Sequence, residues 1–169
     1  MILWNYETRQ VEFALPFDCQ TNEWECFISN VIMDDKKGII YIDSMIRQDN
    51  KSIEPHILHM INIKDGHISE GVRQDEPISD SEIAERAAAP FGLAVPRTFG
   101  TMSLSADSKY LIYHWASTVD ILDATDPSQV IEQVKAPPGR RFSKVQFSPD
   151  GRFVEVAIDG STSVVEFHP

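Results

Sequence analysis

The histidines and cysteines of this 169-residue chain are its first candidates for chemistry. His56 and His59 are three residues apart, a spacing that two ligands of one metal ion can have. The proline and apolar residues around them indicate a strand, however, and residues three apart on a strand point to opposite faces. Cys19 and Cys26 fit no zinc-binding spacing. We therefore expect no metal site and no cofactor.

Catalytic motifs give no stronger signal. The sequence contains neither a Gly-x-Ser-x-Gly elbow nor a glycine-rich phosphate loop. The carboxylate pairs Asp34-Asp35 and Asp123/Asp126 fall in predicted turns, where aspartate is common because it bonds its own backbone. His114 lies in an apolar segment, which favours a packed histidine over a catalytic one. We expect a protein that is not an enzyme.

A basic cluster and one tryptophan are the candidate partner-binding residues. Arg140, Arg141, Lys144 and Arg152 are close together in an otherwise acidic chain. They are either solvated charges at strand edges or a docking patch for an acidic peptide or subunit. Trp115 is either a packing residue or, if exposed, an interface anchor.

Charge restricts the possible partners. The chain has 15 basic and 26 acidic residues, a formal net charge of −11. Such a field repels phosphate backbones, so we expect no direct contact with nucleic acid, and it favours a basic protein partner. The hydrophobic share of 42% is ordinary for a globular protein. The N-terminal MILWNYETRQ resembles neither a signal peptide nor a membrane span, so we expect a soluble protein of the cytoplasm or nucleus.

An internal repeat organises the second half of the chain. The segment LSADSKYLIYHW from Leu104 matches FSPDGRFVEVAI from Phe147 at an offset of 43 residues. In each copy an apolar strand leads into a turn and a second strand; Pro, Asp and Gly give the Ser148–Gly151 turn its conformation. A period of 40 to 45 residues is typical of a four-stranded propeller blade.

These segments resemble WD40 and related β-propeller proteins, including the TolB-like ones. The resemblance rests on VQFSPDGRFVEVAIDGSTSVVEF from Val145, SLSADSKYLIYHW from Ser103 and ILWNYETRQ from Ile2. It implies a mostly β fold made of antiparallel four-stranded blades of a partial β-propeller. A short helix is predicted over Asp80–Ala88, because Ser79 and Glu82 have capping-box spacing.

The predicted organisation is one propeller-like domain, or part of one, of roughly three blades. Apolar alternation and the repeat also predict a set of core residues. The predicted core consists of Phe147, Phe153, Val156, Val164 and Phe167, with Leu104, Tyr110, Tyr113, Ile121 and Leu122 as their counterparts. The predicted boundaries are 1–15 for the end of a blade, 24–72 for a diverged blade, 73–98 for an insertion, 99–136 for a blade and 143–169 for an incomplete blade.

The function expected from this organisation is protein binding. Propellers dock partners on loops from several blades, so we expect a non-enzymatic scaffold within a larger assembly. Three blades are too few to close a ring, so we expect a homodimer or a heteromeric complex. Two alternatives remain open: an acidic inhibitor or immunity-type protein that blocks a basic partner, and the propeller lobe of a hydrolase.

Overall fold

The computed structural model shows a mostly β protein with antiparallel sheets. It describes residues 2–5, 9–14, 25–47, 53–77, 101–115, 117–138, 140–158 and 161–166. No helix occurs among these residues, and none of the described segments could cross a membrane as a helix. The helix predicted over Asp80–Ala88 lies outside the described residues.

The strands form four separate sheets, and in each sheet consecutive strands pair antiparallel. A two-stranded sheet holds β1 (Ile2–Asn5) and β2 (Gln10–Ala14). The first four-stranded sheet holds β3 (Glu25–Asp34), β4 (Ile39–Arg47), β5 (Ile53–Asn62) and β6 (Ile68–Pro77). The middle sheet holds β7 (Thr101–Leu104), β8 (Tyr110–Trp115), β9 (Thr118–Asp123) and β10 (Asp126–Lys135). The last sheet holds β11 (Phe142–Phe147), β12 (Phe153–Ile158) and β13 (Ser161–Glu166).

The repeat found in the sequence is a repeat of structure. Strands β8 and β9 begin and end 43 residues before β12 and β13. In both turns a serine hydroxyl accepts the amide hydrogen of the residue five positions later, Tyr110 for Ser105 and Phe153 for Ser148, at 3.0 Å. The same hydroxyls donate to Asp107 and Asp150. The equivalence predicted for the two turns is confirmed.

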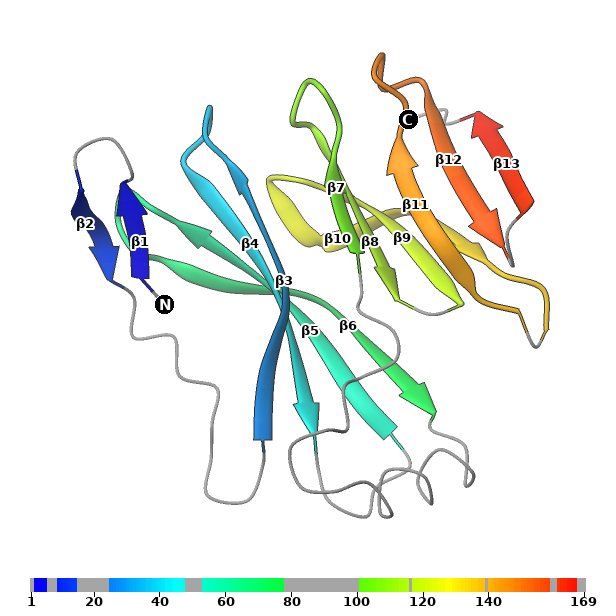
Figure 1. The fold of residues 1–169 in the computed structure, drawn as a ribbon, viewed down its shortest axis with the longest axis horizontal. Helices are drawn as coiled ribbons and strands as arrows, with labels where there is room; N and C mark the ends of the chain where they lie inside the picture. Colours follow the sequence, from blue (N-terminus) through cyan, green and yellow to red (C-terminus); the bar gives the residue numbers. More distant parts are fainter. Residues whose placement is uncertain are drawn as a thin grey trace.

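The three larger sheets stack face to face in chain order (Figure 1). The middle sheet is buried on both faces, because successive side chains of β8 point in opposite directions. Leu111 and Tyr113 pack toward the β3–β6 sheet, and Ile112 packs toward the β11–β13 sheet. The core therefore comprises two apolar seams, one on each side of the middle sheet, and a third cluster of Ile40, Ile42 and Ile61 on the opposite face of the β3–β6 sheet.

Neighbouring sheets also approach each other edge to edge. The first strands β3, β7 and β11 lie next to one another, and the last strands β6 and β10 do the same. At the β6–β10 contact the backbones are so close that a Cβ on Gly71 would lie 2.8 Å from the carbonyl oxygen of Pro127. Only glycine fits at this position without moving Pro127.

Two sequence-based expectations need correction. Phe153 is half-buried, because it points to the face opposite Val154 and Val156 and so misses the seam. Strand β6 continues to Pro77, beyond the boundary predicted at residue 72 between the diverged blade and the insertion, because pairing with β5 extends that far. Leu104 and Tyr110 are also only partly buried, whereas Tyr113, Ile121, Leu122, Phe147 and Val156 are buried as predicted. The side chain of Val164 and all of Phe167 lie outside the described part of the chain.

Candidate functional site

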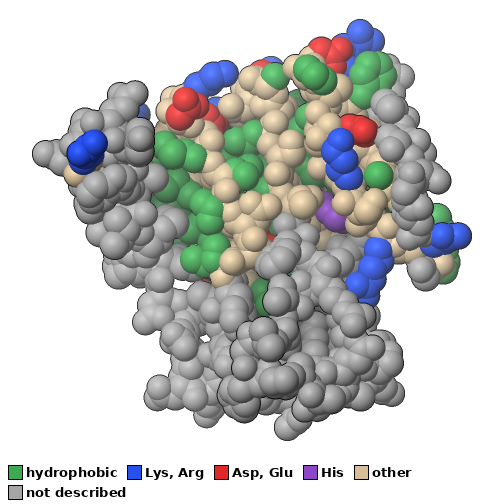
Figure 2. Space-filling model, in the orientation of Figure 1, with side chains coloured by type: hydrophobic (Ala, Val, Ile, Leu, Met, Phe, Trp, Pro, Cys, Tyr) green, Lys and Arg blue, Asp and Glu red, His purple; other side chains and the backbone are tan. Residues whose placement is uncertain are grey.

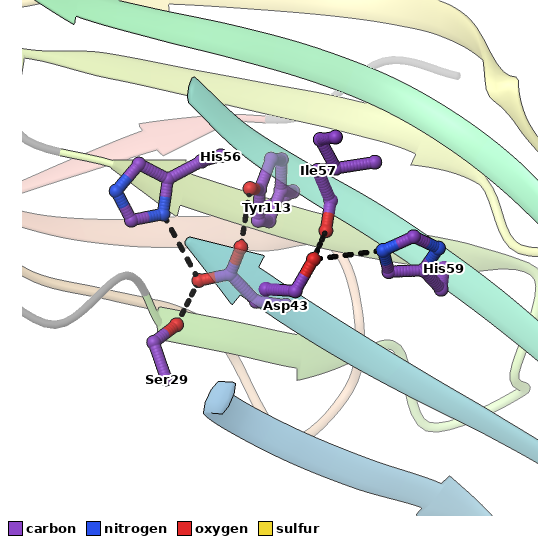
Figure 3. A network of polar contacts seen from close by, with 7 residues as sticks. Ser29, Asp43, His56, Ile57, His59 and Tyr113 are labelled. Carbon is purple, nitrogen blue, oxygen red and sulfur yellow. Dashed lines mark hydrogen bonds and ion pairs between the residues drawn. The ribbon is translucent and has the colours of Figure 1, made fainter. Parts of the chain in front are cut away.

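A polar network surrounds Asp43 inside the seam between the β3–β6 sheet and the middle sheet (Figure 3). The Asp43 carboxylate is 0% exposed. The Tyr113 hydroxyl donates to its Oδ1 at 2.6 Å across the seam. The Ser29 hydroxyl donates to Oδ2, and His56 Nδ1 lies 3.4 Å from the same oxygen. A buried carboxylate is tolerated only with such donors, so these contacts offset the cost of removing it from water.

Strand register explains how these residues meet. A bulge in β3 between Ile28 and Asn30 inserts Ser29 as an extra residue beside the Asp43 position of β4. On β5, Leu58 pairs with Asp43, and His56 lies two residues away on the same face. Burial, then the nearby Asp43 charge, raises the pKa of Tyr113 well above its usual value, so its hydroxyl stays a donor.

His56 is held on its other side by Trp115. The two rings stack with centroids 3.4 Å apart and planes 27° apart. His56 Nε2 and Trp115 Nε1 are buried, and neither has a hydrogen-bond partner among the described residues. Trp115 is 6% exposed, which favours the packing interpretation over the interface one; its partner-binding role stays a prediction.

A second tyrosine crosses the same seam in the opposite direction. The Tyr41 hydroxyl of β4 donates at 2.6 Å to the carbonyl oxygen of Ala124, which follows β9. Nearby, the Lys37 ammonium donates to the carbonyl oxygen of Ser108, so the β3–β4 and β7–β8 turns are also joined. The seam thus combines apolar packing with polar contacts that both sheets donate.

His59 points to the opposite face of the β3–β6 sheet, as the three-residue spacing predicts. His59 Nε2 lies 2.8 Å from the Ser44 hydroxyl, which also donates to the carbonyl oxygen of Ile57. Burial lowers the pKa of His59. A serine beside a histidine is a nucleophile–base arrangement, but Ser44 is 1% exposed and His59 7% exposed. A substrate does not reach this pair, so we interpret it as packing.

The basic residues predicted from sequence do not form one patch. Arg140 and Arg141 precede β11, whereas Arg152 precedes β12; the antiparallel pairing of these strands places Arg152 at the other end of the sheet. Lys144 pairs with Glu155 at 3.3 Å. All four basic side chains are exposed, and their binding role stays a prediction.

The aspartate carboxylates in the turns accept hydrogen bonds from residues of the same turns. The pKa values of Asp107, Asp123 and Asp150 are lowered, mainly because each carboxylate accepts a side-chain hydrogen bond. The donors are Ser105, Thr125 and Ser148, respectively. This supports the interpretation of these aspartates as turn residues. Among the described residues, no group of three or more His, Cys, Asp or Glu side chains could hold a metal ion.

The most exposed apolar side chains of the first sheet lie on its edge strand. Ile28, Val31 and Met33 are 45–46% exposed, and the strand register places them on the face turned away from the middle sheet. We call these three residues the β3 strip. Figure 2 shows hydrophobic side chains gathered over β3 and β4. The strip was not predicted from the sequence, although the spacing of apolar residues within β3 is its signal.

Comparisons with known proteins identify no family for this chain. No family model and no curated protein matches its sequence. Among solved structures it is similar to Hsv2 of Kluyveromyces lactis, with 8% identity and a TM-score of 0.43. That match covers 98% of this chain and 54% of the Hsv2 chain, so this chain spans about half the length of that neighbour.

Proposed function

We propose that this chain is a non-enzymatic protein-binding scaffold of β-propeller type, and a subunit of a larger assembly in the cytoplasm or nucleus. The observation that carries the proposal is the unequal ends of the sheet stack. At one end the β3–β6 sheet presents the exposed β3 strip. Apolar side chains in a continuous row are costly in water and favour association.

Strand register describes that end more fully. Met33, Ile40, Ile61 and Ile68 form one apolar row across all four strands of the β3–β6 sheet. The two central residues are buried, whereas Met33 and Ile68, on the edge strands, are exposed. The exposed edges of this row are where a further protein surface can add.

At the other end of the stack, the outer face of β11 and β12 carries a polar cluster around Glu155. Glu155 stands 43 residues after the buried Ile112, in the equivalent position of the repeat. Gln146 and Lys144 both donate to Glu155, at 2.6 and 3.3 Å. Burying the Glu155 carboxylate and its two donors against an apolar sheet costs more free energy than burying an isoleucine. These contacts support association through the β3–β6 end.

Light scattering on the whole chain at micromolar concentration tests the proposal. We expect a dimer or larger species, and a monomer when Val31 and Met33 are both replaced by aspartate. Val130→Asp with Ile131→Asp is the matched control, because these two side chains are about as exposed but lie on β10. Two results together overturn the proposal. The purified wild-type chain would have to be a folded monomer, and the protein isolated from its own cells would have to show the native mass of a single chain.

A further inference from the structure

We propose that the Asp43–Tyr113 hydrogen bond is a register lock that fixes how the middle sheet sits on the β3–β6 sheet. The rest of the seam is mainly apolar: its buried members include Leu58, Met102, Leu111 and Leu122. Apolar attraction is proportional to buried area and has no direction. It holds two sheets together, but it does not select one alignment among several that bury similar areas.

The carboxylate of Asp43 supplies the missing direction. The contacts of its Oδ2 come from its own sheet, from Ser29 of β3 and His56 of β5. Its Oδ1 receives its hydrogen bond from Tyr113, on the other sheet. If the sheets slide, Oδ1 loses its donor while it remains buried, and an unpaired buried charge is strongly unfavourable. Only one alignment satisfies both oxygens.

Tyr41 provides an internal comparison for Tyr113. Both hydroxyls cross the same seam at 2.6 Å, and both rings are 0% exposed. The acceptor of Tyr41 is the backbone carbonyl of Ala124, which carries no net charge. Losing a hydrogen bond to a neutral group is less costly than losing one to a charged group. The lock therefore resides in Tyr113 and Asp43, and Tyr41 is the matched control.

Amide NMR spectra of the full chain test the lock. In Tyr113→Phe we expect more than one resonance for many amides of β3–β10 and a single set for β11–β13. In Tyr41→Phe we expect a single set throughout. A uniform loss of stability produces no such multiplicity, so the spectrum separates a register role from a merely structural one.

A second variant removes the whole network. Ser29→Ala, Asp43→Leu, His56→Leu and Tyr113→Phe together remove the Asp43 network from the seam and leave its other buried carboxylates, Asp34 and Asp120, unchanged. We expect this variant to retain its sheets but to show several sets of amide resonances across the seam. A single set in both this variant and Tyr113→Phe, with the Tyr41 ring still close to Ala124, overturns the lock. If Tyr41→Phe shows as many sets of amide resonances as Tyr113→Phe, the lock is also overturned. If the fourfold variant does not fold, the spectrum of Tyr113→Phe alone decides whether the lock exists.

Discussion

At the scale of residues, neighbours along a strand have different surroundings because strand geometry sends them to opposite faces. Asp43 and Ser44 are adjacent on β4, yet Asp43 faces the seam and Ser44 faces away from it. His56 and His59 repeat this division on β5. His56 and His59 therefore belong to separate clusters, and each can be tested alone.

The two seam tyrosines differ in the charge of their acceptors, and we expect their removal to differ in cost. Tyr113→Phe deprives a buried carboxylate of a donor and lowers the free energy of unfolding by about 1.5–3 kcal/mol. Tyr41→Phe deprives a carbonyl group and costs about 0.5–1.5 kcal/mol. Urea unfolding of both variants at neutral pH measures the difference. A larger loss for Tyr41→Phe contradicts this expectation.

His59 links stability to pH. Burial lowers its pKa in the folded state from the ordinary value of 6.5. As pH falls below that value, the unfolded chain binds a proton that the folded chain resists. Stability contributed by His59 is therefore present above pH 6.5 and lost toward lower pH. We expect the free energy of unfolding to fall more steeply between pH 7.5 and 5.5 in the wild type than in His59→Gln. Equal slopes in urea unfolding exclude this role.

At the scale of elements, the two turns of the repeat show how one backbone accommodates different residues. Gly151 and Ser108 occupy the same place, 43 residues apart, and both have positive φ, 72° and 58°. Glycine adopts this conformation without strain, whereas serine does not.

Exchanging these two residues should move stability in opposite directions. Ser108→Gly relieves the strain and raises the free energy of unfolding by about 0.5–1 kcal/mol, after the entropy cost of glycine. Gly151→Ser should lower it by a similar amount. A Cβ at Gly151 meets no atom within 4 Å, so the backbone alone decides this cost. Thermal unfolding of the two variants measures both shifts, and a destabilising Ser108→Gly rejects the explanation.

At the scale of the whole molecule, stability depends on the two seams between stacked sheets. The middle sheet contributes a face to each seam, with Leu111 and Tyr113 on one side and Ile112 on the other. The stack becomes polar where Glu155 stands in the place of Ile112. Substitutions in a seam should therefore cost far more than substitutions on the outer face of the last sheet.

Two phenylalanines on either side of one turn measure this contrast. Phe147 is 8% exposed and packs into the seam with the middle sheet. Phe153 is half-buried on the outer face, with the Arg152 guanidinium 5.3 Å from the centre of its ring. We expect Phe147→Ala to cost about 3–5 kcal/mol and Phe153→Ala about 1–2 kcal/mol. Urea unfolding gives both values, and similar costs contradict the assignment of faces.

The sequence by itself determined the local structure of this protein. The 43-residue offset, the Ser-x-Asp turns and the alternation of apolar residues identified equivalent strands in the middle and last sheets. They did so because turn conformation and strand pairing depend on residues close together in the chain. The spacing of His56 and His59 likewise placed these two side chains on opposite faces.

Only the tertiary structure decided which faces meet. Asp43 and Tyr113 are 70 residues apart and belong to different sheets, so no local pattern joins them. Trp115 was ambiguous in sequence and Phe153 was wrongly predicted in the core, since an aromatic side chain suits either a seam or an outer face. The stacking of one sheet on another settled both, because burial depends on the neighbour that covers a face and not on the strand that carries it.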